Sequence, residues 1–238
     1  MSTSPLISVC IATYNGESFI KEQLASILVQ LNPFDEIIIS DDHSTDKTIS
    51  IIESFQDPRI QIYYNPGEKG YTPNFQHSLT KATGQYIFLA DQDDIWSKDK
   101  VSLCLQYLKK YDFIVSDAIV IDNNGRVLSE SFFKERNPYY SVIGNIYKFG
   151  YLGCCFAFNR KVLKKVLPFP KNHKLATHDN WIFLSTSSFY RYIILNDKLV
   201  FYRRHHNNTS SGGEKSKTSF IFKIKYRIYL IFNIIKRK

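Results

Sequence analysis

The sequence contains few cysteines and no long apolar run. Its 238 residues include four cysteines, and none of them belongs to a Cys-x-x-Cys pair. The adjacent Cys154 and Cys155 lie in an apolar stretch, which indicates reduced core cysteines rather than a disulfide framework or a zinc site. No apolar segment approaches the roughly 18 residues of a membrane-spanning helix, and the first residues do not resemble a signal peptide. We therefore expect a cytoplasmic protein without a transmembrane helix.

Several catalytic and binding motifs are also missing. The sequence has neither the GxxxxGK[ST] nor the GxGxxG pattern of glycine-rich phosphate loops. It has no G-x-S-x-G element and no cysteine in a polar loop, so nothing indicates a nucleophilic triad. If the protein binds a nucleotide, we expect a metal ion to hold its phosphates.

Positive charge is concentrated at the end of the chain. The formal net charge is +9, and residues 214–238 carry eight Lys or Arg side chains against a single glutamate. Seven of the nine charges therefore belong to this tail, which argues against a nucleic-acid-binding body.

Up to about residue 110, short β-rich segments alternate with segments of helical spacing. The expected strands cover residues 7–13, 36–40, 59–64 and 86–90. The expected helices cover residues 17–30, 47–55 and 72–82. This alternation predicts an α/β fold, with a mainly parallel central sheet and helices on both faces.

Beyond residue 110 the pattern changes. Residues 113–121 and 126–128 flank an Asn-Asn-Gly turn and predict a hairpin. Residues 132–145 predict a loop-rich region that could line a cleft. The remaining expected elements are a strand at 152–159, helices at 160–166 and 177–189, and a last strand at 192–202.

Three carboxylates, Asp91, Asp93 and Asp94, follow the expected strand 86–90. Open α/β sheets bind ligands at the carboxyl ends of their strands. In extended chain Asp91 and Asp93 would point the same way. Two such oxygen ligands can hold a divalent cation, which can hold a diphosphate. The alternative is a solvated acidic turn that caps the following helix.

Two further strand ends carry polar side chains. After the first strand, Tyr14 could stack on a base and Thr13 could bond a nucleotide, unless this segment is an ordinary turn. After the second strand, Asp42 could accept a hydrogen bond from a base or a ribose hydroxyl, or could cap the next helix.

Other candidates lie late in the chain. Asp179 stands at the start of an expected helix and could be a general base or only a cap. His205 and His206 follow Arg203 and Arg204. Two histidines beside these arginines could meet a metal-bound diphosphate, although lone polar-loop histidines are most often surface residues.

Together these segments resemble family 2 inverting glycosyltransferases with the GT-A fold, over roughly residues 5–212. The matching motifs lie at 8–16, 39–46, 84–96, 153–158, 178–179 and 202–208. The Asp-Gln-Asp-Asp-Ile-Trp and His-Asp-x-Trp forms are similar to those of bacterial O-antigen and capsule enzymes, rhamnosyltransferases among them. The resemblance implies a GT-A domain over residues 1–213, with a nucleotide-sugar half to about residue 110 and an acceptor half after it.

The resemblance implies a role for each matched residue. Thr13, Tyr14 and Asp42 would hold the nucleoside of a UDP- or dTDP-linked sugar. Asp179 would be the base. Many relatives carry Glu-Asp where this chain has His178-Asp179, so the role of His178 stays open.

The resemblance also implies a metal site for Mg²⁺ or Mn²⁺. Asp91 and Asp93 would form the DxD pair, and Asp93 would be the direct metal ligand. His205 would contact the metal or the phosphate. Relatives often have glycine where His206 stands, so either histidine could do this work.

These roles predict a metal-assisted single displacement that inverts the sugar and passes it to a saccharide hydroxyl, with Asp179 as base. The acceptor would be a lipid-linked saccharide of surface polysaccharide synthesis. One rival is an inactive nucleotide-sugar-binding or assembly protein of the same fold, and another is a metal-dependent phosphohydrolase.

The basic tail, residues 214–238, predicts an interfacial helix. Its apolar side chains would enter the headgroup boundary, and its Lys and Arg side chains would meet anionic lipid. This places the enzyme at the inner face of the cell membrane. The alternative is a basic helix that packs on the catalytic domain.

Overall fold

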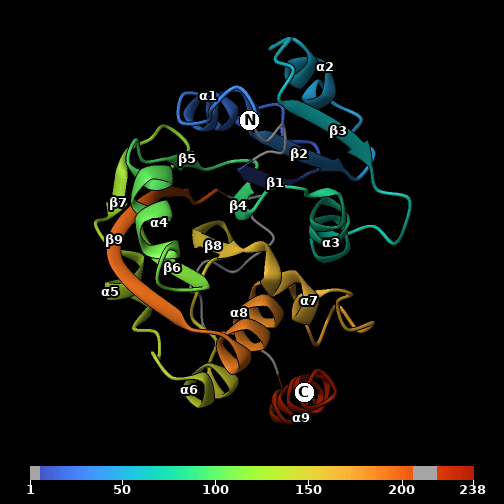
Figure 1. Ribbon diagram of the computed structural model, residues 1–238, viewed down its shortest axis with the longest axis vertical. Helices are drawn as coiled ribbons and strands as arrows, with labels where there is room; N and C mark the ends of the chain where they lie inside the picture. Colours follow the sequence, from blue (N-terminus) through green and yellow to red (C-terminus); the bar gives the residue numbers. More distant parts are fainter. Residues whose placement is uncertain (1–5, 206–218) are drawn as a thin grey trace.

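The structure is a computed structural model that describes residues 6–205 and 219–238 (Figure 1). Within these residues, nine strands form one sheet in the order β3-β2-β1-β4-β8-β6-β9-β5, and β7 pairs with β6. The strands are β1 Ile7–Thr13, β2 Glu36–Asp41, β3 Ile60–Tyr64, β4 Tyr86–Asp91, β5 Ile95–Trp96, β6 Phe113–Ile121, β7 Val127–Ser129, β8 Phe156–Asn159 and β9 Tyr192–Arg203.

The pairing of the strands confirms a mainly parallel sheet. β3, β2, β1 and β4 are mutually parallel, and so are β6 and β9. β8 joins these two groups and runs antiparallel to β4 and β6. β7 runs antiparallel to β6, as the predicted hairpin requires. The two-residue strand β5, which the sequence pattern did not predict, pairs antiparallel with β9.

The described helices cover both faces of this sheet (Figure 1). They are α1 Ile20–Leu28, α2 Thr48–Glu53, α3 Tyr71–Lys81, α4 Lys100–Leu108, α5 Phe132–Arg136, α6 Val142–Tyr147, α7 Leu163–Val166, α8 His178–Phe189 and α9 Phe220–Ile235, with 3₁₀ turns η1 Gly153–Cys155 and η2 Arg160–Val162.

Alternate strand residues belong to two hydrophobic cores, because successive side chains of a strand point to opposite faces. Val9 and Ile37 pack with α1, α2 and α4. Cys10 and Ile38 pack with α3, α7 and α8. All four cysteines are buried and free, which confirms the prediction of reduced core cysteines.

Two sequence expectations after residue 110 are wrong in detail. The region 132–145 contains α5 and the start of α6 instead of irregular loop. Ser131 and Ser141 cap these helices by accepting hydrogen bonds from Lys134 N and Gly144 N. The strand expected at 152–159 begins only at Phe156, because the 3₁₀ turn η1 precedes it.

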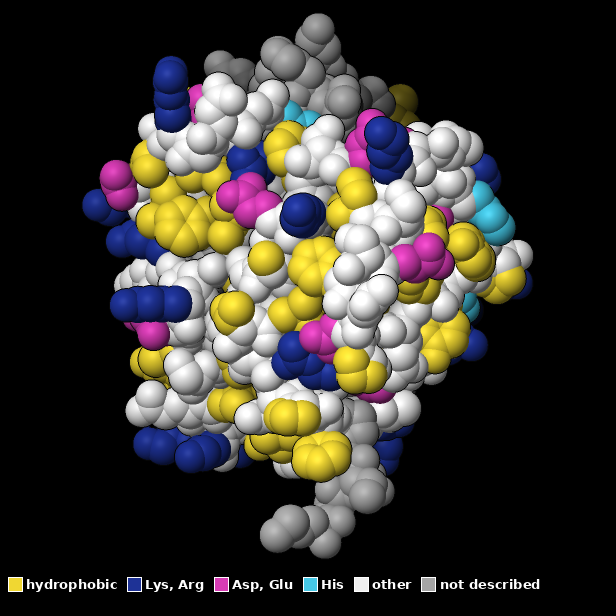
Figure 2. Space-filling model, turned by 90° about the horizontal axis from the view of Figure 1, so that it is seen from above, with side chains coloured by type: hydrophobic (Ala, Val, Ile, Leu, Met, Phe, Trp, Pro, Cys, Tyr) yellow, Lys and Arg dark blue, Asp and Glu magenta, His cyan; other side chains and the backbone are white. Residues whose placement is uncertain are grey.

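The tail helix α9 lies beyond α7 and α8, at the bottom of Figure 1. Leu230 of α9 is fully buried against the domain. Among the helices of the described ranges, none is both long and apolar enough to cross a bilayer. On the face drawn in Figure 2, Lys and Arg side chains are intermingled with Asp and Glu side chains, as expected for a body whose excess positive charge lies in the tail.

Candidate active site

One cavity, of about 860 Å³, opens where β1, β2, β4 and β9 end. Seven residues to which the sequence analysis assigns a role in the site line it. These residues are Thr13, Tyr14, Asp42, Asp91, Asp93, Asp179 and His205. They come from five separate segments of the chain, so the fold gathers them in one place. The region 126–148, in contrast, contributes no described residue to the lining.

The ends of β1 and β2 form a closed network of hydrogen bonds. Thr13 Oγ1 donates to Asp41 Oδ2 at 2.7 Å, so its hydrogen is engaged within the protein. Asp42 Oδ1 accepts from Asn65 Nδ2 at 2.6 Å, and Oδ2 accepts from Gly70 N at 2.7 Å. The Asp42 carboxylate is therefore buried but fixed in orientation at the cavity wall.

The loop after β1 presents an aromatic ring to the cavity. Tyr14 is 51% exposed, and Lys69 Nζ lies 6.0 Å from the centre of its ring. Gln92, beside the acidic residues, hydrogen-bonds the Tyr14 backbone. Because only the backbone of Tyr14 is held, its ring remains available to a planar ligand.

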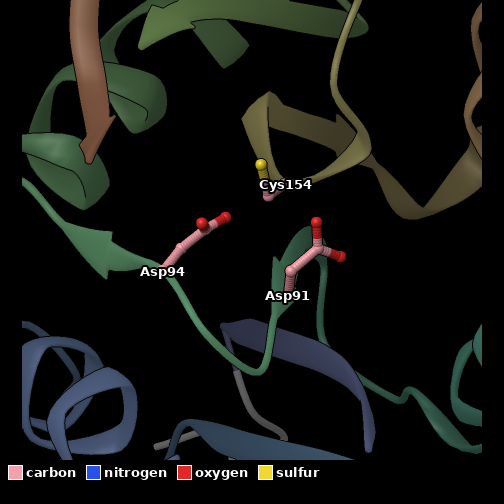
Figure 3. A group of neighbouring side chains, drawn as sticks. All are labelled: Asp91, Asp94 and Cys154. Carbon is pink, nitrogen blue, oxygen red and sulfur yellow. The ribbon is translucent and has the colours of Figure 1, made fainter. Parts of the chain in front are cut away.

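The acidic run forms a turn instead of extended chain, so the alternation argument for Asp91 and Asp93 does not apply, although both residues line the cavity. Asp91 ends β4, and Gln92 and Asp93 lie in a turn. Asp91 also converges with Asp94 and with Cys154 of η1, and one ligand atom from each lies within 4.8 Å of the others (Figure 3).

Burial changes the protonation of this acidic group. It raises the pKa of Asp91 to about 7, helped by the charges of Asp93 and Asp179. Burial, with the charges of Asp93 and Asp91, likewise raises the pKa of Asp94. Asp94 Oδ1 accepts from Arg203 N at 2.9 Å, whereas its buried Oδ2 has no hydrogen-bond partner within the described ranges.

Asp93 turns toward the end of β9. Its Oδ2 lies 2.7 Å from His205 Nε2, and both side chains are largely buried. Arg203 Nε donates to the backbone oxygen of Asp93 at 2.9 Å, while its Nη2 meets Glu22 at 2.6 Å. The buried Arg203 thus supports the acidic turn from behind and is absent from the cavity lining. Arg204 pairs with Glu135 at 2.9 Å, and His206 lies outside the described residues.

The start of α8 places His178 beside Asp179. His178 Nε2 lies 2.6 Å from Asp179 Oδ1. Burial alone would lower the pKa of His178, but the Asp179 carboxylate, with Asp91, more than offsets this and raises it. Gly153 of η1 lies against the pair, and a Cβ there would overlap Asp179 Oδ1. Close approach therefore requires glycine at this position.

Comparison with known proteins shows the family of this chain. The family model "Glycosyl transferase family 2" matches residues 8–167. The chain belongs to glycosyl transferase family 2. The family predicted from the sequence is thus confirmed.

Two curated relatives of this family 2 chain are bacterial enzymes. One is the UDP-Glc:alpha-D-GlcNAc-diphosphoundecaprenol beta-1,3-glucosyltransferase WfgD of Escherichia coli, 27% identical over 76% of this chain and 69% of its own. Another is the dTDP-rhamnosyl transferase RfbG of Shigella flexneri, 30% identical over 71% of this chain and 60% of its own. Among the first relatives the matched share of the relative is as low as 36%, so this chain spans only part of their length.

Solved structures confirm the GT-A fold. TarS of S. aureus, residues 1–349 with UDP-GlcNAc, matches with a TM-score of 0.73 at 20% identity, over 95% of this chain and 66% of that one. The mannosyltransferase PcManGT of Pyrobaculum calidifontis, with GDP-Man and Mn²⁺, matches with a TM-score of 0.62 at 16% identity, over 98% and 74%.

Three residues that position this family 2 site escaped the sequence analysis. Gln92 and Gly153 stand inside the matched motifs, but their close contacts depend on loops far away in the sequence. Lys100 is buried, donates to Cys154 O at 2.5 Å and lies 4.6 Å from the centre of the Trp96 ring. A lysine in an apolar helical pattern gives no sequence signal for such a role.

Proposed function

We propose that this chain is an inverting glycosyltransferase. It transfers a sugar from a UDP- or dTDP-linked donor to a hydroxyl of a lipid-linked saccharide in bacterial surface polysaccharide synthesis. One observation carries the proposal: a single cavity joins the nucleotide-side residues, the acidic turn and Asp179. The catalytic domain comprises residues 1–213, with the donor half before about residue 110 and the acceptor half after it. Residues 214–238 form the tail.

The donor nucleoside lies over the ends of β1 and β2. Tyr14 stacks on the base with its exposed ring. Asp42 accepts from the base or the ribose, in an orientation fixed by Asn65 and Gly70. Thr13 supports this wall through Asp41, and only its hydroxyl lone pairs remain to accept from a ligand.

The acidic turn fits Mg²⁺ or Mn²⁺. Asp91 and Asp93 offer carboxylate oxygens to the cavity, and such oxygens are the ligands these cations prefer. His205 reaches the same place through Asp93, as a ligand or as a partner that orients a ligand. The Cys154 thiol suits a hard cation poorly, because a hydrogen bond with Cys155 and burial raise its pKa. A bound cation would neutralise the negative charge that develops on the leaving diphosphate.

Asp179 is the base. As the acceptor oxygen attacks the anomeric carbon, Asp179 takes the hydroxyl proton. The new C–O bond forms while the bond to the diphosphate breaks, and the electron pair of that bond leaves with the nucleoside diphosphate. A positioned base of this kind contributes about 10²–10⁴-fold. One carboxylate at the acceptor side suits single displacement with inversion.

The names of the relatives support the choice of donor and acceptor. WfgD uses UDP-Glc and an acceptor on diphosphoundecaprenol, and RfbG is a dTDP-rhamnosyl transferase. Carried to this chain as a proposal, they favour a UDP- or dTDP-sugar and an acceptor that remains in the membrane.

The tail helix α9 supports the proposal that the enzyme acts at the inner face of the cell membrane. Leu230 and its neighbours attach α9 to the domain. The side of α9 opposite Leu230 carries four apolar side chains that are each more than half exposed: Ile221, Ile228, Phe232 and Ile235. Their spacing of three, four and seven residues places them on one side of the helix. This apolar stripe, with tail Lys and Arg side chains worth about 1 kcal/mol each near anionic lipid, suits the membrane surface.

The test is a screen of UDP- and dTDP-sugars with Mg²⁺ or Mn²⁺. The expected result is metal-dependent thermal stabilisation by one donor, and transfer to a lipid-linked acceptor with an inverted anomeric centre. Binding without transfer or donor hydrolysis would favour an inactive binding protein. Hydrolysis of simple phosphate esters without sugar transfer would favour a phosphohydrolase.

A further inference from the structure

We propose that His178 is a positioning residue that works through Asp179: its imidazole N–H holds one carboxylate oxygen, so that the other oxygen is directed at the proton of the acceptor hydroxyl. This inference rests on the proposed function. It concerns a position where a histidine stands at the edge of the cavity, directly before the proposed base.

The distance and burial of the pair carry the first step. His178 Nε2 and Asp179 Oδ1 lie 2.6 Å apart, with side-chain exposures of 6% and 25%. Within the described ranges, neither ring nitrogen nor Oδ1 has a hydrogen-bond partner of regular geometry. A small rotation of either side chain would align Nε2 with Oδ1. Since Oδ1 is buried, Oδ2 is the oxygen left to face an acceptor.

The imidazole plane is fixed by its neighbours. Phe75 of α3 stacks on it, with ring centres 4.2 Å apart and planes 19° apart. Tyr71 meets it edge-on at 5.6 Å. The backbone N–H of His178 donates to Thr72 Oγ1 at 3.1 Å. The ring therefore cannot leave Asp179 without disturbing α3.

The 3₁₀ turn η1 closes the other side of the pair. A Cβ on Gly153 would overlap Asp179 Oδ1 and lie 2.9 Å from His178 Nε2. The Lys100 ammonium holds this turn through Cys154 O. The backbone is thus brought against both side chains, which keeps water from the space between them.

Three titratable groups face His178. Asp179 adjoins it on α8, Asp91 acts on it from the end of β4, and Tyr71 faces it from α3. Burial lowers the pKa of His178, but the two carboxylates outweigh burial and raise it. Burial and the charge of Asp179 raise the pKa of Tyr71, which keeps it neutral. The two carboxylates therefore favour the protonated form of the His178 imidazole.

The proton is accounted for at each stage. In the reactive form the imidazole is neutral, with its hydrogen on Nε2, and donates to the Asp179 carboxylate at Oδ1. The acceptor hydroxyl gives its proton to Asp179 Oδ2 as the acceptor oxygen attacks the anomeric carbon and the nucleoside diphosphate leaves with the electron pair of the broken bond. Asp179 then releases this proton to water. An imidazolium would lower the basicity of Asp179, so the rate rises with pH as His178 loses its second ring proton.

The test compares His178→Phe, which keeps a ring to stack on Phe75, with His178→Gln, which keeps a polar group. His173→Gln is the matched control, because His173 lies outside the cavity lining. In both His178 variants, kcat should fall at least about tenfold while the donor KM stays within about twofold. In both His178 variants, the pH below which kcat falls should shift from about pH 6.5 or above, the wild-type value, to below about pH 5.

Histidine titration by NMR tests the pair without any activity. The His178 titration midpoint should fall in Asp179→Asn and stay unchanged in a His173→Gln protein. A His178→Phe enzyme with the wild-type rate and pH profile would show that the ring only packs, and would overturn the proposal. So would an unshifted His178 midpoint in Asp179→Asn. If the His178 midpoint falls in Asp179→Asn but the wild-type protein transfers no sugar, the pairing stands and the proposed function is overturned.

Discussion

The side-chain amide of Gln92 hydrogen-bonds both backbone polar groups of Tyr14. Oε1 accepts from Tyr14 N at 2.9 Å, and Nε2 donates to Tyr14 O at 3.1 Å. Gly16 lies against the same amide, where a Cβ would overlap Gln92 Oε1. These contacts tie the loop after β1 to the acidic turn after β4. The proposed base-stacking ring and the proposed metal ligands are therefore held in fixed positions relative to each other at the cavity wall.

Loss of the hydrogen bonds between the Gln92 side chain and the Tyr14 backbone should weaken donor binding. Gln92→Ala removes two hydrogen bonds, each worth about 1 kcal/mol, so the donor KM should rise by about tenfold while kcat changes by less than about threefold. Donor titration and steady-state kinetics measure both. Gln106→Ala, on the exposed side of α4, is the matched control and should behave as wild type. An unchanged donor KM in Gln92→Ala would mean that Tyr14 keeps its position without these two hydrogen bonds.

Removal of the Asp93 charge should abolish the metal dependence of the protein. Asp93→Asn keeps the size of the side chain but weakens both cation binding and the contact with His205. Transfer should fall by at least about 10²-fold, and Mn²⁺ should no longer add to donor-induced thermal stabilisation. Asp197→Asn, an exposed carboxylate in β9, is the control. Wild-type activity in excess EDTA would contradict the metal site altogether.

Asp179→Asn should separate binding from chemistry. The amide keeps the shape of the carboxyl group at the start of α8 but cannot take a proton. Transfer should fall by about 10²–10⁴-fold, while donor affinity remains near wild type. Isothermal titration with donor and a single-turnover transfer assay measure the two effects. Normal turnover would mean that Asp179 only caps the helix and that the base lies elsewhere.

Strand composition and motif spacing were enough to predict the sheet and the gathering of the site. The buried runs ending at Thr13, Asp41 and Asp91 became parallel neighbours, and parallel strands bring their carboxyl ends to one edge. The contacts that the site residues make with one another at that edge could not be predicted from the sequence. Asp91 also approaches Asp94 and Cys154 because the chain turns at Gln92 and Asp93, and a period-two argument holds only in extended chain.

Other errors had a similar physical origin. The helices α5 and α6 have five and six residues, too few to show a helical period, and serine caps define them. No sequence pattern indicated that Arg203 supports the acidic turn. Its guanidinium direction depends on Glu22 and the Asp93 backbone, which lie far away in the sequence.

The unfolding temperature should reveal the charge of His178. Its pKa is raised in the folded state, because the carboxylates outweigh burial. Its stabilising contribution is therefore fully present below the unfolded value of about 6.5 and is lost as pH rises through the folded pKa. The difference in unfolding temperature between wild type and His178→Gln should be largest near about pH 6 and shrink at higher pH. A difference that grows with pH would reverse the sign and contradict the pairing with Asp179.

The final prediction concerns the two sides of α9. The tail sequence showed no clean division into a polar and an apolar face because two apolar sides overlap in it. One contains Leu230 and packs on the domain, and the other contains Ile221, Ile228 and Phe232 and is exposed. Deleting the helix would disturb both sides at once, so substitutions on one side are the sharper test.

Changing Ile221, Ile228 and Phe232 together to Gln should release the protein from anionic liposomes. Each apolar side chain that enters the headgroup boundary contributes about 1.5–3 kcal/mol, so vesicle affinity should fall well over tenfold in sedimentation. The unfolding temperature and transfer to a short soluble acceptor should stay near wild type. Leu230→Ala is the complementary variant: it should cost about 2–5 kcal/mol of stability with little effect on vesicle affinity. Added salt should weaken wild-type binding, because screening reduces the attraction of the tail Lys and Arg side chains to anionic lipid. If the triple variant still sediments with liposomes like the wild type, the exposed side of α9 does not contact the membrane.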